Sequence, residues 1–254
     1  MLLAIDIGNT NLNLGAFEGE TLKATWRLAT DTNKMPDEYN ALMQTLLPLK
    51  GIQPGEIKSI IMCSVVPPLT TVFEELCRNF FSVKPLVIGP GTKTGVRILY
   101  DPPRDVGADR VVDAAAAYRL HGGPVIVVDF GTATVFDAVT RDGDYLGGSL
   151  VPGITVAANA LYTSASQLRR VELVAPKTAI GRTTAAALQS GLVLGQVSMV
   201  EGMVERFRAE LGRDAKAIAT GGLAPLIAKE TDIFHEVNQD LTLIGLHMMY
   251  HMNV

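Results

Sequence analysis

The sequence is poor in several features that mark whole classes of protein. It has only two cysteines, Cys63 and Cys77, and they do not form a CxxC pair. No apolar run approaches the roughly 18 residues that a membrane span needs. No block of lysine and arginine is present that would neutralise a phosphate backbone. We therefore expect no disulfide framework, no membrane span and no nucleic-acid partner.

What remains is the composition of a globular protein. Apolar residues make up 48% and charged residues 19% of the 254 positions, and the formal net charge is −4 at pH 7. This length allows one or two domains with a substantial core. The start of the chain has no basic stretch or apolar h-region before Asp6, so we expect no signal peptide. Two buried free thiols then fit a reducing cytoplasm.

A short pattern occurs twice. "AIDIGNTNLNLGAF" (4–17) and "VVDFGTATVFDAV" (127–139) each run from an apolar strand into Asp-x-Gly, then an Asn/Thr cluster and a second strand. The aspartates, Asp6 and Asp129, lie 123 residues apart, close to half the chain. This repeat indicates an internal duplication of one α/β unit.

Hydrophobic periodicity and turn residues predict the same order of elements in both parts. The predicted strands are 1–8, 12–17, 22–30, 59–66, 85–89, 124–131, 134–140, 145–153 and 215–222. The predicted helices are 37–50, 67–81, 109–122, 154–165, 183–209, 222–230 and 241–252. We expect two α/β domains, residues 1–120 and 121–254, with a ligand at the strand ends between them.

The residue types of the repeated turn suit a charged ligand. A strand that ends in Asp presents a carboxylate, Gly permits a tight turn, and Asn and Thr offer amides and hydroxyls to an anion. One such turn is most often only a turn. Two of them favour a nucleoside triphosphate with its cation. A third turn, "ATGGLAP" (219–225), follows a strand and could pack against a base or ribose.

These motifs together resemble a known family. The two Asp-x-Gly turns and "ATGG" (219–222) are similar to the phosphate and adenosine motifs of the acetate kinase, sugar kinase, chaperone ATPase and actin superfamily. More narrowly, "YDPPRDVGADR" (100–110), "YLGGSLVPGI" (145–154), "GRTTAAALQSG" (181–191) and "TGGLAPLIA" (220–228) resemble type III pantothenate kinase. The resemblance covers nearly the whole chain. It implies two ribonuclease H-like, actin-like halves with a nucleotide cleft between them.

The resemblance also implies an activity and a set of site residues. The activity is the ATP-dependent phosphorylation of pantothenate, the first step of coenzyme A biosynthesis, in a homodimer that uses Mg²⁺ and K⁺ or NH₄⁺. The implied ATP-binding residues are Asp6, Ile7, Gly8, Asn9, Thr10, Asn11, Leu12, Asn13 and Thr132. The implied pantothenate-binding residues are Tyr100, Gly107, Ala108, Asp109, Arg110 and Thr184. Asp109 is the implied general base, Asp129 the monovalent-cation ligand and Asp6 a Mg²⁺ ligand.

Other interpretations of these residues exist. By residue type alone, Asp109 is more readily a helix N-cap than a base. His247 and His251 could share a metal, although packing is the commoner role of such a pair. "GPGTKTG" (89–95) lacks the spacing and context of a P-loop. The rival functions are a kinase of another small alcohol, and a relative that has lost catalysis and serves as a regulatory or transcription accessory protein.

Overall fold

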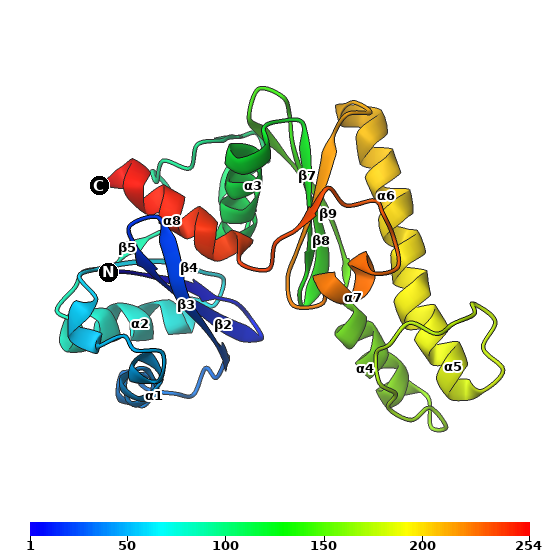
Figure 1. Ribbon diagram of the computed structural model, residues 1–254, viewed down its shortest axis with the longest axis horizontal. Coiled ribbons are helices and arrows are strands. Elements are labelled where there is room, and N and C mark those ends of the chain that lie inside the picture. The colour runs from blue at the N-terminus through cyan, green and yellow to red at the C-terminus, as the bar shows by residue number, and fades with distance from the viewer. The chain divides into compact units, whose positions relative to one another are not determined.

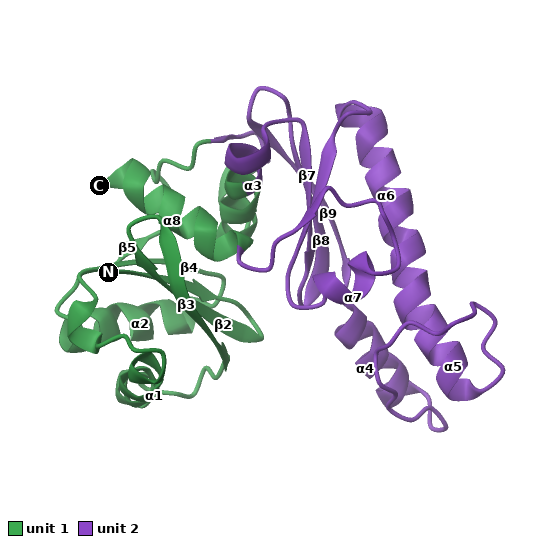
Figure 2. Ribbon diagram, viewed as in Figure 1, with its two compact units in different colours: residues 1–95, 101–116, 241–254 green, residues 96–100, 117–240 purple.

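The computed structural model describes all residues, 1–254, and divides them into two compact units (Figures 1 and 2). Unit 1 holds residues 1–95, 101–116 and 241–254, and unit 2 holds residues 96–100 and 117–240. The predicted division at residue 120 differs from this in one main respect. The last helix is grouped with unit 1, where it contacts strands of the unit 1 sheet and where Gly245 packs on Val112 and Ala116 of the helix over residues 108–121.

Unit 1 is built on a five-stranded mixed sheet of order β3-β2-β1-β4-β5. Its strands are β1 (Leu2–Ile7), β2 (Asn11–Glu18), β3 (Thr21–Ala29), β4 (Ser59–Ser64) and β5 (Leu86–Val87). β1, β2 and β3 pair antiparallel, whereas β4 runs parallel to β1 and β5 parallel to β4.

Helices cover both faces of this sheet (Figure 1). They are α1 (Pro36–Leu49), α2 (Pro67–Phe80), the first part of α3 (Ala108–His121) and α8 (Leu241–Asn253). Alternate β1 side chains Leu3, Ile5 and Ile7 form one core with apolar residues of α1 and α2. The opposite face lies against α8, where Leu243 packs over Gly15. Asp6 alternates with the core residues of β1 and therefore lies on this second face.

Unit 2 repeats the strand order of unit 1. Its sheet has the order β11-β10-β7-β8-β9-β6. Its strands are β6 (Arg97–Ile98), β7 (Val125–Phe130), β8 (Ala133–Val139), β9 (Asp144–Pro152), β10 (Lys216–Thr220) and β11 (Glu236–Val237). The series β9-β8-β7-β10-β11 matches β3-β2-β1-β4-β5 strand for strand and direction for direction. The predicted duplication is confirmed, and β6 is an addition at one edge.

Helices of unit 2 form a second core with this sheet. They are α4 (Ile154–Ser164), α5 (Thr184–Gln189), α6 (Gly195–Leu211) and α7 (Ala224–Ala228). The helix predicted over 183–209 is interrupted by a π-helical turn at Ser190–Leu194, which joins α5 to α6. No helix in the molecule is long and apolar enough to cross a membrane.

Candidate functional site

The first Asp-x-Gly turn is held by the end of a neighbouring strand. Within the turn, the Gly8 amide donates to the Asn11 carbonyl at 3.0 Å. Thr30, just after β3, closes it from outside: its hydroxyl donates to the Gly8 carbonyl at 2.6 Å and its amide to the Thr10 carbonyl at 3.0 Å. These hydrogen bonds hold the short polar turn in place beside the Asp6 carboxylate.

Asp6 is a buried carboxylate with two neutral hydrogen-bond donors. It is 8% exposed. The Asn13 amide donates to its Oδ2 at 2.8 Å, and the Cys63 thiol lies 3.4 Å from its Oδ1. Burial, with a smaller contribution from the negative charge of Asp109, raises the pKa of Asp6 to about 6, while the two donors partly oppose that shift. The carboxylate therefore carries a charge that nothing among these neighbours neutralises.

Among the nine residues predicted to bind the nucleotide, five in and around the first turn fall into two sets. The side chains of Ile7 and Leu12 are fully buried in the core of unit 1, so only their backbones could meet a ligand. The side chains of Asn9, Thr10 and Asn11 are exposed at the turn. The turn residues therefore suit a phosphate contact, and Ile7 and Leu12 anchor the turn to the sheet.

Asp109 lies in the first turn of α3, one residue after the helix begins at Ala108. It is therefore not the N-cap, which was the structural alternative for this residue. Its Oδ1 accepts a hydrogen bond from the Arg110 amide at 2.8 Å. Burial raises its pKa above the ordinary value of 3.8, and the Arg110 amide and side chain partly oppose the shift. The negative charge of Asp109 also contributes to the raised pKa of Asp6, so the two carboxyls lie within electrostatic reach of each other inside unit 1.

The second Asp-x-Gly turn, in unit 2, packs against two glycines whose backbones come too close to it for any side chain. Gly221 has a φ of +88°, and a Cβ there would overlap the Asp129 carboxylate and the Phe130 backbone. A Cβ added at Gly153 would lie 2.5 Å from the carbonyl oxygens of Gly131 and Thr132. The Gly153 amide donates to the Thr132 carbonyl at 3.0 Å. The predicted second phosphate turn and the predicted adenosine turn therefore meet at Asp129.

The other predicted substrate residues lie in unit 2. The ring of Tyr100 covers Gly147, where a Cβ would lie 2.6 Å from it, and its centroid is 6.4 Å from that of Tyr145. Thr132 is exposed in the second turn. Thr184 is exposed at the start of α5. The structure thus brings Asp6 and Asp109 together in unit 1, whereas Tyr100, Asp129, Thr132 and Thr184 belong to unit 2.

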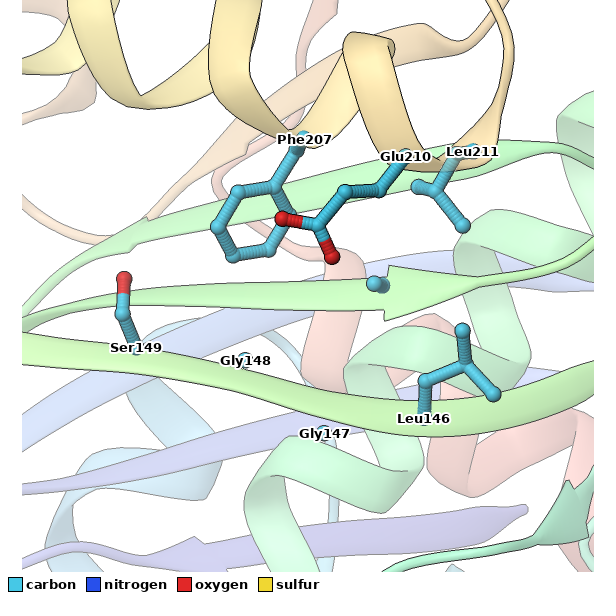
Figure 3. A pocket seen from close by; sticks show the side chains of 8 residues that line it. Leu146, Gly147, Gly148, Ser149, Phe207, Glu210 and Leu211 are labelled. Atoms are coloured by element: carbon cyan, nitrogen blue, oxygen red, sulfur yellow. The ribbon is translucent and has the colours of Figure 1, made fainter.

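A pocket of about 270 Å³ lies elsewhere in unit 2, between β9 and the end of α6 (Figure 3). Leu146 and Ser149 approach it from the sheet, and Phe207, Glu210 and Leu211 from the helix. None of the predicted site residues lines it. One lining residue, Gly147, is also the residue that the ring of Tyr100 covers.

The histidine pair of α8 makes packing contacts. The ring of His247 is 4% exposed and stacks on Phe17 with a centroid distance of 4.4 Å. Its Nε2 lies 2.8 Å from the Gly19 carbonyl and 3.3 Å from Nε2 of His251. No group of three or more metal-binding side chains gathers there. These contacts fasten the last helix to the sheet of unit 1.

Some residues that support the site were not assigned a role from the sequence. Arg27 donates from Nε to Oδ1 of Asn13 at 3.2 Å, and Cys63 reaches Asp6 from β4. One residue from each of four adjacent strands forms a row across the sheet, in the order Arg27, Asn13, Asp6 and Cys63. The signal available in the sequence was the strand alternation, but a row of this kind appears only once the register is known.

Comparison with known proteins gives close relatives over the whole chain. The sequence profile of the type III pantothenate kinase family matches residues 2–206. A type III pantothenate kinase of Dehalococcoides mccartyi strain BAV1 is 51% identical over 252 residues, covering 99% of this chain and 96% of the relative. That of Myxococcus xanthus strain DK1622 is 51% identical over 253 residues, covering 100% and 99%.

Solved structures share the fold at low sequence identity. A putative Baf family transcriptional activator from Campylobacter jejuni has a TM-score of 0.63 at 20% identity, covering 99% of this chain and 98% of that one. A polyphosphate/ATP-glucomannokinase from Arthrobacter has a TM-score of 0.50 at 15% identity, covering 100% and 99%. At these identities the likeness concerns the fold alone, which is the two-domain actin-like fold.

Proposed function

The chain belongs to the type III pantothenate kinase family and catalyses the phosphorylation of pantothenate in coenzyme A biosynthesis, and we propose that Asp109 is its general base. The observation that carries this role is the pairing of Asp6 with Asp109 in unit 1. Both carboxyls have a raised pKa because both are withdrawn from water. Such a pair fits a site in which one acid meets a cation and the other a proton.

The residues around Asp6 fit magnesium-bound ATP. The Asp6 carboxylate is buried among neutral donors and beside a second acid, an arrangement that a cation would stabilise. Carboxylate oxygens are also the ligands that Mg²⁺ prefers. When bound, the ion would offset charge on the phosphate oxygens. The exposed residues of the turn, Asn9 to Asn11, would contact the phosphates.

In the proposed reaction, the primary hydroxyl of pantothenate attacks the γ-phosphorus of ATP. A new O–P bond forms, the bond from γ-phosphorus to the ADP oxygen breaks, and Asp109 accepts the hydroxyl proton. A positioned proton acceptor is typically worth about 10² to 10⁴ in rate. Withdrawal from water makes Asp109 a better proton acceptor, because it raises the pKa of the carboxyl toward the pH at which the enzyme works.

Arg110 and the start of α3 are proposed to bind pantothenate. Its carboxylate suits the positive side chain of Arg110 and the amides at the helix N-terminus. Tyr100 and Thr184 are proposed as further contacts, on the basis of the family resemblance. The close approach of Tyr100 to Gly147 gives that ring a defined place in unit 2.

Asp129 is proposed to bind a monovalent cation. Its carboxylate lies against Gly221 at the meeting of two turns rich in backbone oxygens, and oxygen is the ligand that such ions prefer. The ion would offset charge close to the phosphates bound by Thr132.

We also propose that two copies of the chain associate. Large apolar side chains are exposed on β9, α4 and the segment after it, among them Leu150, Leu161 and Ile180, the last at 82%. Gly191 and Gly195 leave open space along the neighbouring helix. A second copy fits this surface, and sedimentation velocity at micromolar concentration should report a dimer; a monomer would contradict it.

Two buried free thiols fit a reducing cytoplasm.

The decisive test is a coupled assay of ADP release with and without pantothenate, together with ³¹P NMR of the product. We expect ADP release to depend on pantothenate and the product to be a phosphate monoester. A panel of other small alcohols serves as the control. A higher kcat/KM for any of them, or pantothenate-independent hydrolysis alone, would contradict the proposal.

A further inference from the structure

The row Arg27–Asn13–Asp6–Cys63 has one weak point, the Asn13 amide. An amide group can turn over and exchange its oxygen and nitrogen at little steric cost. In the structure, Nδ2 of Asn13 donates to Asp6 at 2.8 Å and Oδ1 accepts from Nε of Arg27 at 3.2 Å. A turned-over amide would place its oxygen against the Asp6 carboxylate and its NH₂ group against the guanidinium. Both contacts would then be repulsive.

The two neighbours of Asn13 make this orientation unique. An ionised carboxylate only accepts hydrogen bonds, and a guanidinium only donates them. Asp6 therefore selects the NH₂ end of the amide, and Arg27 selects the oxygen end. If Arg27 were absent, Oδ1 of Asn13 would lose this hydrogen bond, and the side chain could rotate away from Asp6.

We propose that Arg27 is a positioning residue for Mg-ATP, which acts by holding the Asn13 amide with its NH₂ group on Asp6. This inference rests on the proposed role of Asp6 in binding Mg-ATP. In this arrangement Asn13 occupies one oxygen of Asp6 and fixes the plane of the carboxylate. Asp6 then meets its ligand in one orientation, which lowers the cost of ordering it on binding. In this role Arg27 acts through Asn13 alone.

The matched pair Arg27→Gln and Arg27→Met tests the hydrogen bond. Nε2 of glutamine stands at the same position along the side chain as Nε of arginine, so Arg27→Gln keeps the donor and removes the charge. Methionine has similar length and no donor. We expect Arg27→Met to weaken Mg-ATP binding about three- to tenfold, and Arg27→Gln to stay within about twofold of wild type. Lys23→Met removes another cation from the same strand and should have no effect.

The readouts are calorimetric binding of a non-hydrolysable Mg-ATP analogue, and the separate KM and kcat values for both substrates. In Arg27→Met the KM for Mg-ATP should rise, while the KM for pantothenate stays unchanged. A purely structural role would instead lower the melting temperature and affect both substrates alike.

A double-mutant cycle with Asn13→Ala decides whether Arg27 acts through Asn13. We expect Arg27→Met to add nothing once Asn13 is alanine. Multiplied effects, or an Arg27→Gln variant as weak as Arg27→Met, would show that the arginine charge meets the nucleotide directly and would overturn the proposal. So would an Arg27→Met variant that binds like wild type. Asp6→Asn is measured in parallel: if it leaves Mg-ATP binding unchanged, the role of Asp6 fails, and that failure is visible without Arg27.

Discussion

The two halves of the molecule build the same turn in different ways. In unit 1 the row across the sheet at the level of Asp6 is Arg27, Asn13, Asp6 and Cys63. In unit 2 the matching row at the level of Asp129 is Leu150, Val135, Asp129 and Thr220. The polar pair beside Asp6 is thus replaced by an apolar pair beside Asp129. Unit 2 instead brings glycine backbone, Gly153 and Gly221, against its turn.

We propose that this difference reflects separate ligands for the two aspartates after duplication. A carboxylate in a hydrogen-bonded row has its orientation set by neighbouring side chains, which suits a ligand with strict geometry such as Mg²⁺. A carboxylate closed in by glycine backbone lies among carbonyl groups, which suits a larger and less demanding cation. The predictions below break one half or the other and compare the results.

The largest effect is expected from Asp6→Asn, which keeps the shape of the side chain and removes its charge. We expect kcat/KM for Mg-ATP to fall by about 10² to 10³, the size typical of removing one charge-stabilising group. Steady-state kinetics and circular dichroism measure activity and fold. Near-normal activity in a folded variant would remove Asp6 from the Mg²⁺ role.

The same substitution should stabilise the ligand-free protein. Because burial raises the pKa of Asp6 from 3.8 to about 6, its ionisation destabilises the folded state. The stability it contributes is fully present below pH 4 and is lost as the pH rises through 6. At pH 7 we expect Asp6→Asn to raise the free energy of unfolding by about 3 kcal/mol. Urea denaturation at pH 7 and pH 4 tests this, and the gain should vanish at the lower pH.

Breaking the glycine contacts of unit 2 should have a smaller effect on activity. Gly221→Ala places a Cβ on the Asp129 carboxylate at a φ of +88°, which we expect to cost about 1 to 3 kcal/mol of stability. Gly55→Ala, where an added Cβ meets open space, is the control. Thermal unfolding and Mg-ATP affinity should both change in the first variant only. Equal behaviour of the two would contradict the close packing at Asp129.

The cation dependence should belong to unit 2 alone. Replacing K⁺ by Na⁺ is expected to lower turnover about tenfold, or about 1.4 kcal/mol of transition-state stabilisation. Asp129→Asn should abolish the difference between the two salts. Arg27→Met, which alters unit 1, should leave the ratio unchanged. Wild-type rates that are equal in both salts would refute a monovalent-cation site at Asp129.

The smallest effect is on the pH profile. Burial raises the pKa of Asp109 above 3.8, and the base must be ionised to work. The kcat/KM for pantothenate should therefore decline as the pH falls through that raised value, at a higher pH than for a solvated aspartate. The residual activity of Asp109→Asn should not show this decline at low pH. A decline that persists in the variant would mean that another group causes it.

Much of this architecture could be predicted because its signals are local. Apolar strands that end in Asp-x-Gly specify both strand and turn, and the repeat of that pattern predicts the shared strand order. The family resemblance, not the periodicity, supplied the role of Asp109. Its position one residue inside α3, and not at the N-cap, follows only from where the helix begins.

The rest depends on contacts between distant residues. The return of α8 to unit 1 requires Gly245 to meet Val112, more than a hundred positions away. The row beside Asp6 requires the register of β3, which shifts by a bulge at Ala16 and Phe17. The strands β6 and β11 have two residues each, too few for an alternating pattern to reveal.

Single-turnover phosphoryl transfer in wild type and Asp109→Asn tests the central role most directly. Rapid-quench measurement at saturating Mg-ATP and pantothenate isolates the chemical step from product release. We expect the substitution to slow that step at least about tenfold while the affinity for Mg-ATP stays unchanged. An unchanged rate in the folded variant would show that Asp109 is not the base.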